Sequence, residues 1–172
     1  MFYESIESLV KKNAFKKCKI ITGFNKNEMG LFSISYGLLG RNPAGWQYAA
    51  QTMNFSLFSQ DVAMFFNYYP AYPNVSNQNI TNAIINAYLP KNLTDIATYY
   101  PYLDRIATDF VFSCQSFELS EIYSKQMNDV YFYEYDYKIS STIYPDAVGI
   151  IHADELPIVF DEELSNKVKF YF

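Results

Sequence analysis

The sequence predicts an α/β protein in which short strands alternate with helices and the helices flank a sheet. Two runs have strand character, the β-branched run Cys18–Phe24 and the alternating aromatic run Val130–Tyr137. Helical patterns fill much of the chain between them. The chain has 172 residues, 50% of them hydrophobic, which is enough for one domain and too short for two. Residues 1–172 are therefore expected to belong to a single domain.

The first elements are a helix, a strand and a polar turn. Residues 5–14 predict a short helix with Ser5 as N-cap, although Ser8 stands where a full capping box has Glu or Gln. Cys18–Phe24 follows as a strand. Asn25–Glu28 is polar and turn-forming, as expected of a loop at the carboxyl end of a strand.

The middle of the chain, from about residue 37 to 109, is predicted to be a mostly helical excursion on the outside of the sheet. It contains five of the seven prolines, which break it into short pieces. Helical stretches remain between them, at Asp61–Phe66 and Asn82–Tyr88. We expect no separate domain here.

The last third predicts a helix followed by a strand. Residues 108–127 have helical character, and in Val130–Tyr137 four tyrosines alternate with other residues at period two. We expect these tyrosines to pack in the core, and the acidic residues Glu134 and Asp136 to mark a solvated face near the strand's end.

Charge and hydropathy exclude several classes of partner. The net charge is −5, and basic residues cluster only as the pairs Lys11–Lys12 and Lys16–Lys17, so nucleic acid is not an expected partner. No apolar run approaches the roughly 20 residues that span a bilayer, so no membrane-spanning segment is predicted. Met1–Ser5 carries an early acidic residue, unlike an export signal.

Cysteines and glycosylation motifs bear on the compartment. Cys18 and Cys114 are the two cysteines, and the sequence leaves open whether they pair. Asn-x-Ser/Thr motifs are more frequent than the composition predicts by chance. This excess favours an extracellular or secretory-pathway protein, with candidate glycosylation sites at Asn54, Asn74, Asn79 and Asn92.

His152 and Glu28 are the candidate catalytic residues. His152 is the sole histidine of the chain, so any histidine general base must be this residue. Glu28 follows a strand, where catalytic groups collect, and the order acid-then-histidine matches the end of the Ser…Asp/Glu…His series. No serine has glycine two positions away on both sides. We predict no metal site, no phosphate loop and no cofactor.

Two motifs resemble those of type-B carboxylesterases and cholinesterases. Phe15–Glu28 resembles the family stretch "FKK-x-x-(I/L)-(L/I)-x-G-x-NK-(D/N)-E", and Gly149–Phe160 resembles "G-x-x-H-(A/G)-x-E-(L/I)-x-x-(V/L)-F". The segments 109–114 and 131–135 also fit in order. The resemblance implies the C-terminal portion of an α/β-hydrolase domain with a mixed, mostly parallel sheet, incomplete in this chain. The chain departs from the family at Met29, where relatives usually have Gly, and at Leu31, where choline-selective members have an aromatic residue.

The resemblance implies the acid Glu28 and the base His152 of a catalytic triad. The implied activity is hydrolysis of a small-molecule carboxylic ester through an acyl-serine, with the serine on an upstream N-terminal part of the same domain. Residues 1–172 alone are then expected to be inactive. In cholinesterases the cysteine that resembles Cys114 pairs with one further downstream. We expect the Glu28 carboxylate and the His152 ring to lie about 2.6–3.2 Å apart.

Two other functions share the fold that the resemblance implies. Cholinesterase-like adhesion ectodomains act by surface binding and typically lack the full triad, and a storage role is a third possibility. Retention of Glu28 and His152 favours a serine ester hydrolase over both.

Overall fold

Two parallel strands form the sheet in the part of the chain that the structure describes. The structure is a computed structural model that describes residues 6–30, 51–68, 78–92, 96–126, 129–139, 144 and 146–160. Strand β1 (Ile20–Asn25) pairs with β2 (Val130–Tyr135), with Ile20 opposite Val130 and Asn25 opposite Tyr135. Because parallel strands end at the same edge, the residues after Asn25 and after Tyr135 leave the sheet side by side.

The remaining elements are helical. They are α1 (Ile6–Lys11), α4 (Phe55–Tyr68), α5 (Gln78–Tyr88), α6 (Tyr100–Thr108), the π-helical turn η1 (Asp109–Ser113), α7 (Cys114–Ser124), the 3₁₀ turn η2 (Asp146–Val148) and α8 (Leu156–Val159). Helices α1, α4, α5 and α7 overlap the predicted helices, and α8 was not predicted. Together with the two strands they confirm the predicted α/β class. The Ser5 cap and Leu31 lie outside the described residues.

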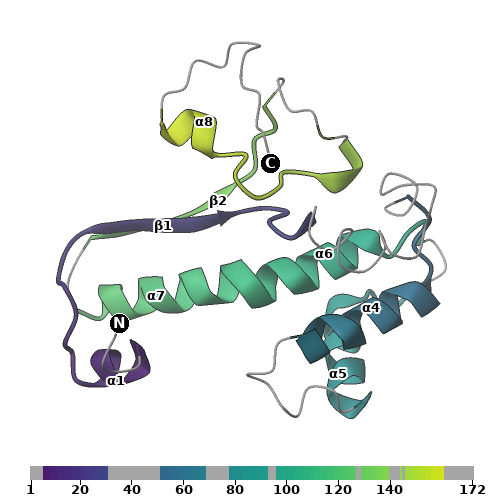
Figure 1. Ribbon diagram of the computed structural model, residues 1–172, viewed down its shortest axis with the longest axis horizontal. Coiled ribbons are helices and arrows are strands. Elements are labelled where there is room, and N and C mark those ends of the chain that lie inside the picture. The colour runs from purple at the N-terminus through teal and green to yellow at the C-terminus, as the bar shows by residue number, and fades with distance from the viewer. Residues whose placement is uncertain are drawn as a thin grey trace.

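A long helix supports the sheet from one side. Figure 1 shows α6, η1 and α7 joined end to end beneath the two strands, with α8 on the opposite side of the sheet. Ser116 of α7 donates its hydroxyl to the carbonyl of Gly23 at 3.3 Å. The helix begins at Tyr100, eight residues before the predicted start. Pro101 lies in its first turn, where its missing N–H has no partner to lose.

The hydrophobic core lies between α4, α5, α6 and the segment that leads to His152. Its buried members are Met53, Phe58, Val62, Ile85, Tyr100, Leu103, Ile106, Val148 and Ile151. The last two belong to the chain around η2. Burial of Ile151, 3% exposed, fixes the backbone directly before His152, since removing such a side chain from its contacts costs about 2–5 kcal/mol.

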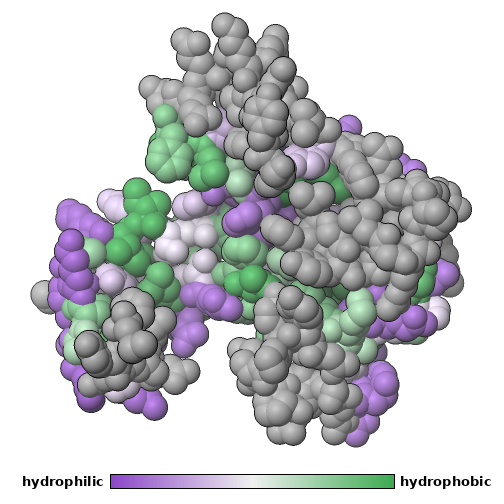
Figure 2. Space-filling model, viewed as in Figure 1, coloured by the Kyte–Doolittle hydropathy of each residue, from purple (hydrophilic) through white to green (hydrophobic). Residues whose placement is uncertain are grey.

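The predicted core packing of the β2 tyrosines is wrong for the described residues. Tyr131 is 62% exposed and Tyr137 is 59% exposed. The reason is that β2 has one strand neighbour among the described residues and α7 packs along one face of the pair, so the tyrosines on the other face are only partly covered. Figure 2 shows apolar side chains at the surface over the strands and over α8. The Glu134 side chain is 43% exposed, in agreement with the predicted solvated face.

Candidate active site

Glu28 is held in a turn that directly follows β1. Its side chain is 6% exposed, and its Oε1 accepts the backbone N–H of Asn25 at 2.7 Å. The N–H of Glu28 in turn donates to the Asn25 carbonyl at 3.3 Å. The backbone thus fixes one oxygen of the Glu28 carboxylate and leaves the second oxygen, Oε2, able to accept a hydrogen bond from another partner.

That partner is His152. Glu28 Oε2 lies 2.7 Å from His152 Nδ1, so the predicted proximity of the two side chains, 124 positions apart, is confirmed. An ionised carboxylate can only accept, so Nδ1 carries the proton and Nε2 is the basic nitrogen of the neutral ring. The His152 side chain is 49% exposed. The pair therefore has a buried acid and a base that is open to solvent.

The aromatic ring of Phe112 lies against the imidazole. The two ring centroids are 5.2 Å apart with an interplanar angle of 42°. Phe112 belongs to η1, the π-helical turn between α6 and α7. A π turn inserts one extra residue per turn and changes which side chains face the sheet edge.

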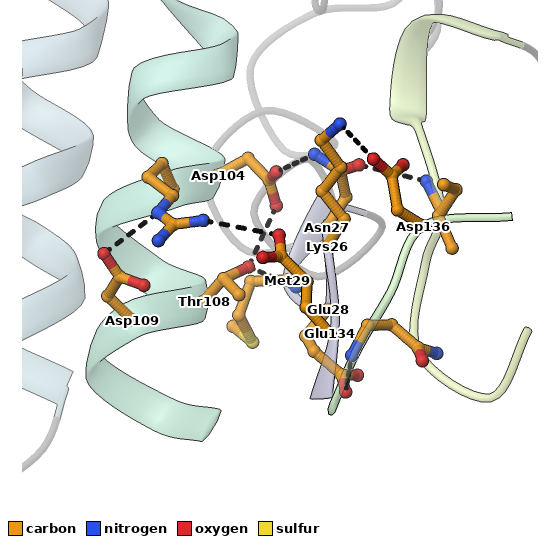
Figure 3. Close-up of polar contacts among 12 residues, drawn as sticks. Lys26, Asn27, Glu28, Met29, Asp104, Thr108, Asp109, Glu134 and Asp136 are labelled. Atoms are coloured by element: carbon orange, nitrogen blue, oxygen red, sulfur yellow. Dashed lines mark hydrogen bonds and ion pairs between the residues drawn. The ribbon is translucent and has the colours of Figure 1, made fainter. Parts of the chain in front are cut away.

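The turn that carries Glu28 is anchored to α6 on both sides of the acid. Asn27 Nδ2 donates to Asp104 Oδ2 at 2.6 Å, and the N–H of Met29 donates to Thr108 Oγ1 at 3.1 Å. Thr108 donates its hydroxyl to Asp104 Oδ1 at 3.3 Å. Figure 3 shows these contacts joining the turn to the helix. They fix the backbone at the residues before and after Glu28.

Asp104 is a buried carboxyl at the centre of this anchor. Burial raises the pKa of Asp104 to about 7, and the hydrogen bonds from Asn27 and Thr108 pull it partly back. The charged form loses its hydration in this position, and the two donors replace only part of it. Asp104 therefore links the folding of the Glu28 turn to pH.

The His152 loop is joined to the same turn. Asn27 donates its N–H to the Ile150 carbonyl at 2.9 Å and accepts the Ile150 N–H on Oδ1 at 3.1 Å. Gly149 has φ +71°, and a Cβ there would lie 2.2 Å from Asn27 Oδ1, so this position requires glycine. After the histidine, Ala153 has φ 73°. Asp154 accepts the Ile151 N–H at 2.9 Å.

Sequence reasoning missed the residues that hold the pair together. The local sequence marks Asn25 and Asn27 only as turn formers, and nothing in it indicates Asp104 or Thr108. The signal that could have found the asparagines is their place in the "NK-(D/N)-E" motif, directly before the acid. Asp104 is 77 positions from Asn27, and no local pattern reports a contact of that separation.

Other predicted sites lie away from this pair. Asn54, Asn79 and Asn92 are exposed, and Asn74 falls outside the described residues. Asn54 accepts the Leu57 N–H at 3.0 Å on its side chain and so caps α4. The glycosylation of these residues stays a prediction.

The described residues contain no three His, Cys, Asp or Glu side chains grouped as metal ligands. Cys18 and Cys114 are both thiols in the structure, Cys18 half-buried and Cys114 exposed. No helix within the described ranges has the length and apolar character needed to cross a bilayer.

Comparison with known proteins identifies the family. A model described as "Carboxylesterase family" matches residues 2–171. The chain belongs to the carboxylesterase family. It is 23% identical over 168 residues to acetylcholinesterase 1 of Caenorhabditis elegans, a match that covers 95% of this chain and 26% of that protein.

Two further relatives agree with the family. The chain is 22% identical over 163 residues to the cholinesterase of Mus musculus, covering 95% of this chain and 25% of the relative. It is 32% identical over 93 residues to a secreted lipase of Arthroderma benhamiae, covering 51% of this chain and 16% of the lipase. The chain thus spans about a quarter of the length of the cholinesterase relatives it matches. Membership supports the α/β-hydrolase fold, to which the parallel strand pair and its helices conform.

Proposed function

We propose that this chain supplies the acid and the general base of a serine-dependent carboxylic ester hydrolase. The observation that carries the proposal is the 2.7 Å contact between Glu28 Oε2 and His152 Nδ1. It lies at the carboxyl end of a parallel strand, in a chain of the carboxylesterase family. In α/β enzymes, catalytic side chains gather at this end of the strands.

The nucleophilic serine would come from a segment outside residues 1–172, because no serine in this sequence lies in a Gly-x-Ser-x-Gly motif. His152 Nε2 takes the serine Oγ proton while Oγ bonds to the ester carbonyl carbon. The imidazolium then gives that proton to the departing alcohol, which leaves an acyl-serine. Water attacks the acyl carbon next, its proton passes through Nε2 to the serine oxygen, and the acid is released.

Glu28 would orient the imidazole and stabilise its cationic form in both steps. Both of its oxygens are occupied by donors, the Asn25 N–H and the His152 Nδ1–H. Glutamine at this position has one acceptor oxygen and one NH₂ group. One of the two donors would then face another donor, and a neutral amide would no longer stabilise the imidazolium.

The test is kinetic and uses residues 1–172 joined to the serine-bearing segment. With an activated phenyl ester, Glu28→Gln is expected to lower kcat by roughly 10⁴-fold with little change in KM, and His152→Gln by at least as much. Glu118→Gln, the same change at an exposed residue of α7, serves as the matched control. Retention of kcat within about tenfold in Glu28→Gln would remove the catalytic role of Glu28, whereas absence of turnover in the unchanged protein would favour a non-catalytic adhesion protein.

We further propose that the parent protein enters the secretory pathway. Three of the four glycosylation motifs place their asparagines at the surface among the described residues, and one relative is named a secreted lipase. Carbohydrate on Asn requires an exposed acceptor in an exported protein. Ser56→Ala, which destroys the Asn54 motif, tests this proposal through the loss of glycosidase-sensitive mass.

A further inference from the structure

Asn25, the last residue of β1, contacts Glu28 and the loop that carries His152. Its backbone N–H donates to Glu28 Oε1 at 2.7 Å. Its side-chain Nδ2 donates to the carbonyl of Ile151, the residue before His152, at 2.8 Å. The second hydrogen of Nδ2 is directed at Glu155 Oε2. One residue therefore touches the acid through its backbone and the histidine loop through its side chain.

The orientation of the Asn25 amide follows from its partners. The Ile151 carbonyl and the Glu155 carboxylate are both acceptors, so the NH₂ group must face them. Asn25 Oδ1 is then buried without a partner among the described residues, and Asn25 is 0% exposed. A desolvated acceptor of this kind is unfavourable. Asparagine is nevertheless the residue whose short side chain presents two donors here.

We propose that the Asn25 side chain is a positioning residue that sets the Glu28–His152 hydrogen bond. The inference rests on the proposed esterase function. By binding the Ile151 carbonyl directly before His152 and the Glu155 carboxylate after it, Asn25 ties the loop on both sides of the histidine, so that Nδ1 faces Oε2. The strand end that carries Asn25 also starts the turn that carries Glu28. The spacing between acid and base is thus set through this single residue.

The Asn25 side chain can be removed without detaching the histidine loop from the rest of the molecule. The adjoining residue Ile150 stays tied to Asn27 through two hydrogen bonds, and Ile151 stays buried in the core. Loss of the Asn25 side chain therefore leaves the loop attached while the backbone at His152 gains freedom. The backbone N–H of residue 25 still donates to Glu28 in every variant except proline. Side-chain variants consequently test the anchoring of the histidine loop alone.

The experiment measures kcat and KM of Asn25→Ala, again with residues 1–172 joined to the serine-bearing segment. Asn86→Ala, at an exposed position of α5, is the matched control. Asn25→Ala is expected to lower kcat roughly tenfold, the factor for one hydrogen bond to a polar or charged partner, with KM within about twofold. In a Glu28→Gln background the same change should have little further effect, because the hydrogen bond that Asn25 positions is already absent.

A second readout follows the hydrogen bond itself. His152 is the one histidine in residues 1–172, so in the joined protein ¹⁵N-histidine labelling restricted to these residues reports on its ring alone. The Nδ1 proton bound to a carboxylate should give a downfield resonance, which Asn25→Ala broadens or removes and Asn86→Ala leaves in place. Glu155→Gln, which keeps an acceptor but removes its charge, should give a smaller, few-fold fall in kcat and guards against misfolding of Asn25→Ala.

The outcomes separate the two proposals. If Glu28→Gln abolishes turnover and Asn25→Ala keeps kcat within about twofold, the positioning role is wrong and the esterase proposal stands. The positioning role is also wrong if Asn25→Ala lowers kcat equally in the Glu28→Gln background, or leaves the Nδ1 proton resonance unchanged. If Glu28→Gln itself leaves turnover intact, the proposed role of Glu28 as the catalytic acid is wrong and the positioning role of Asn25 falls with it.

Discussion

Gly149→Ala should disconnect the histidine loop from the turn that carries the acid. Gly149 has φ +71°, where an L side chain costs about 1–2 kcal/mol. The new Cβ would also lie 2.2 Å from Asn27 Oδ1 and 2.5 Å from its Cγ, so the amide must move. That movement breaks its bonds to Asp104 and to the Ile150 N–H, which contribute about 1 kcal/mol each.

The expected loss is therefore about 3–4 kcal/mol in the free energy of unfolding. A double-mutant cycle with Asn27→Ala separates the two causes. Where Asn27 has already been shortened, only its Cβ stays near the new methyl group, at 3.1 Å, so Gly149→Ala should cost mainly the backbone portion, about 1–2 kcal/mol. The coupling between the two sites is then about 2 kcal/mol, with the double variant more stable than additivity predicts.

The assay is urea unfolding of the four proteins at one pH, with equal m-values as a check that the transitions are comparable. A cost for Gly149→Ala that is equal in both backgrounds would refute the contact with Asn27 as its cause. A cost below about 1 kcal/mol would also refute the strained backbone at this position.

Three further results are expected. Burial raises the folded-state pKa of Asp104 to about 7, whereas the unfolded carboxyl titrates near 4. Between these pH values the folded protein binds more protons than the unfolded chain, so it loses stability as pH rises, by at most about 4 kcal/mol. Asp104→Asn should remove this loss in unfolding measured from pH 4 to 8. Ser56→Ala should abolish glycosylation of Asn54 and preserve its cap on α4. Asn54→Ala should abolish glycosylation and also lower the free energy of unfolding by about 1 kcal/mol. Glycosidase-sensitive mass and melting temperature distinguish the two variants, and equal stability would refute the cap. Ala153→Gly, which relieves a residue at φ 73°, should leave stability unchanged or raise it by up to about 1 kcal/mol; a measured loss of stability would contradict the strain.

The strands were predictable because their signal is local. A β-branched run identified β1 and alternating aromatics identified β2, each within two residues of the observed bounds. The start of α6 was not predictable on the same grounds, because a proline indicates a helix break in the local sequence. Only the structure shows that Pro101 lies in the first turn, where proline is tolerated. The exposure of Tyr131 likewise depends on what covers the sheet, and strand periodicity does not report it.

The candidate site divides in the same way. Glu28 and His152 stand in recognisable motifs, so their proximity could be predicted before their 2.7 Å contact was seen. The residues that hold this pair in place do not stand in motifs that indicate their role. Asp104 gains its role from burial beneath a distant turn, and Asn25 gains its role from acceptors 126 and 130 positions away. Such contacts follow from tertiary packing, which the local sequence does not encode in a readable form.

The most direct test of the central claim is labelling with a fluorophosphonate probe, which reacts with an activated serine. With residues 1–172 joined to the serine-bearing segment, we predict one labelled serine on that segment. Labelling should be lost in His152→Gln and kept in Glu118→Gln, because His152 is the base that activates the nucleophile. Labelling that persists at an unchanged rate in His152→Gln, or a labelled serine in residues 1–172 alone, would contradict the account.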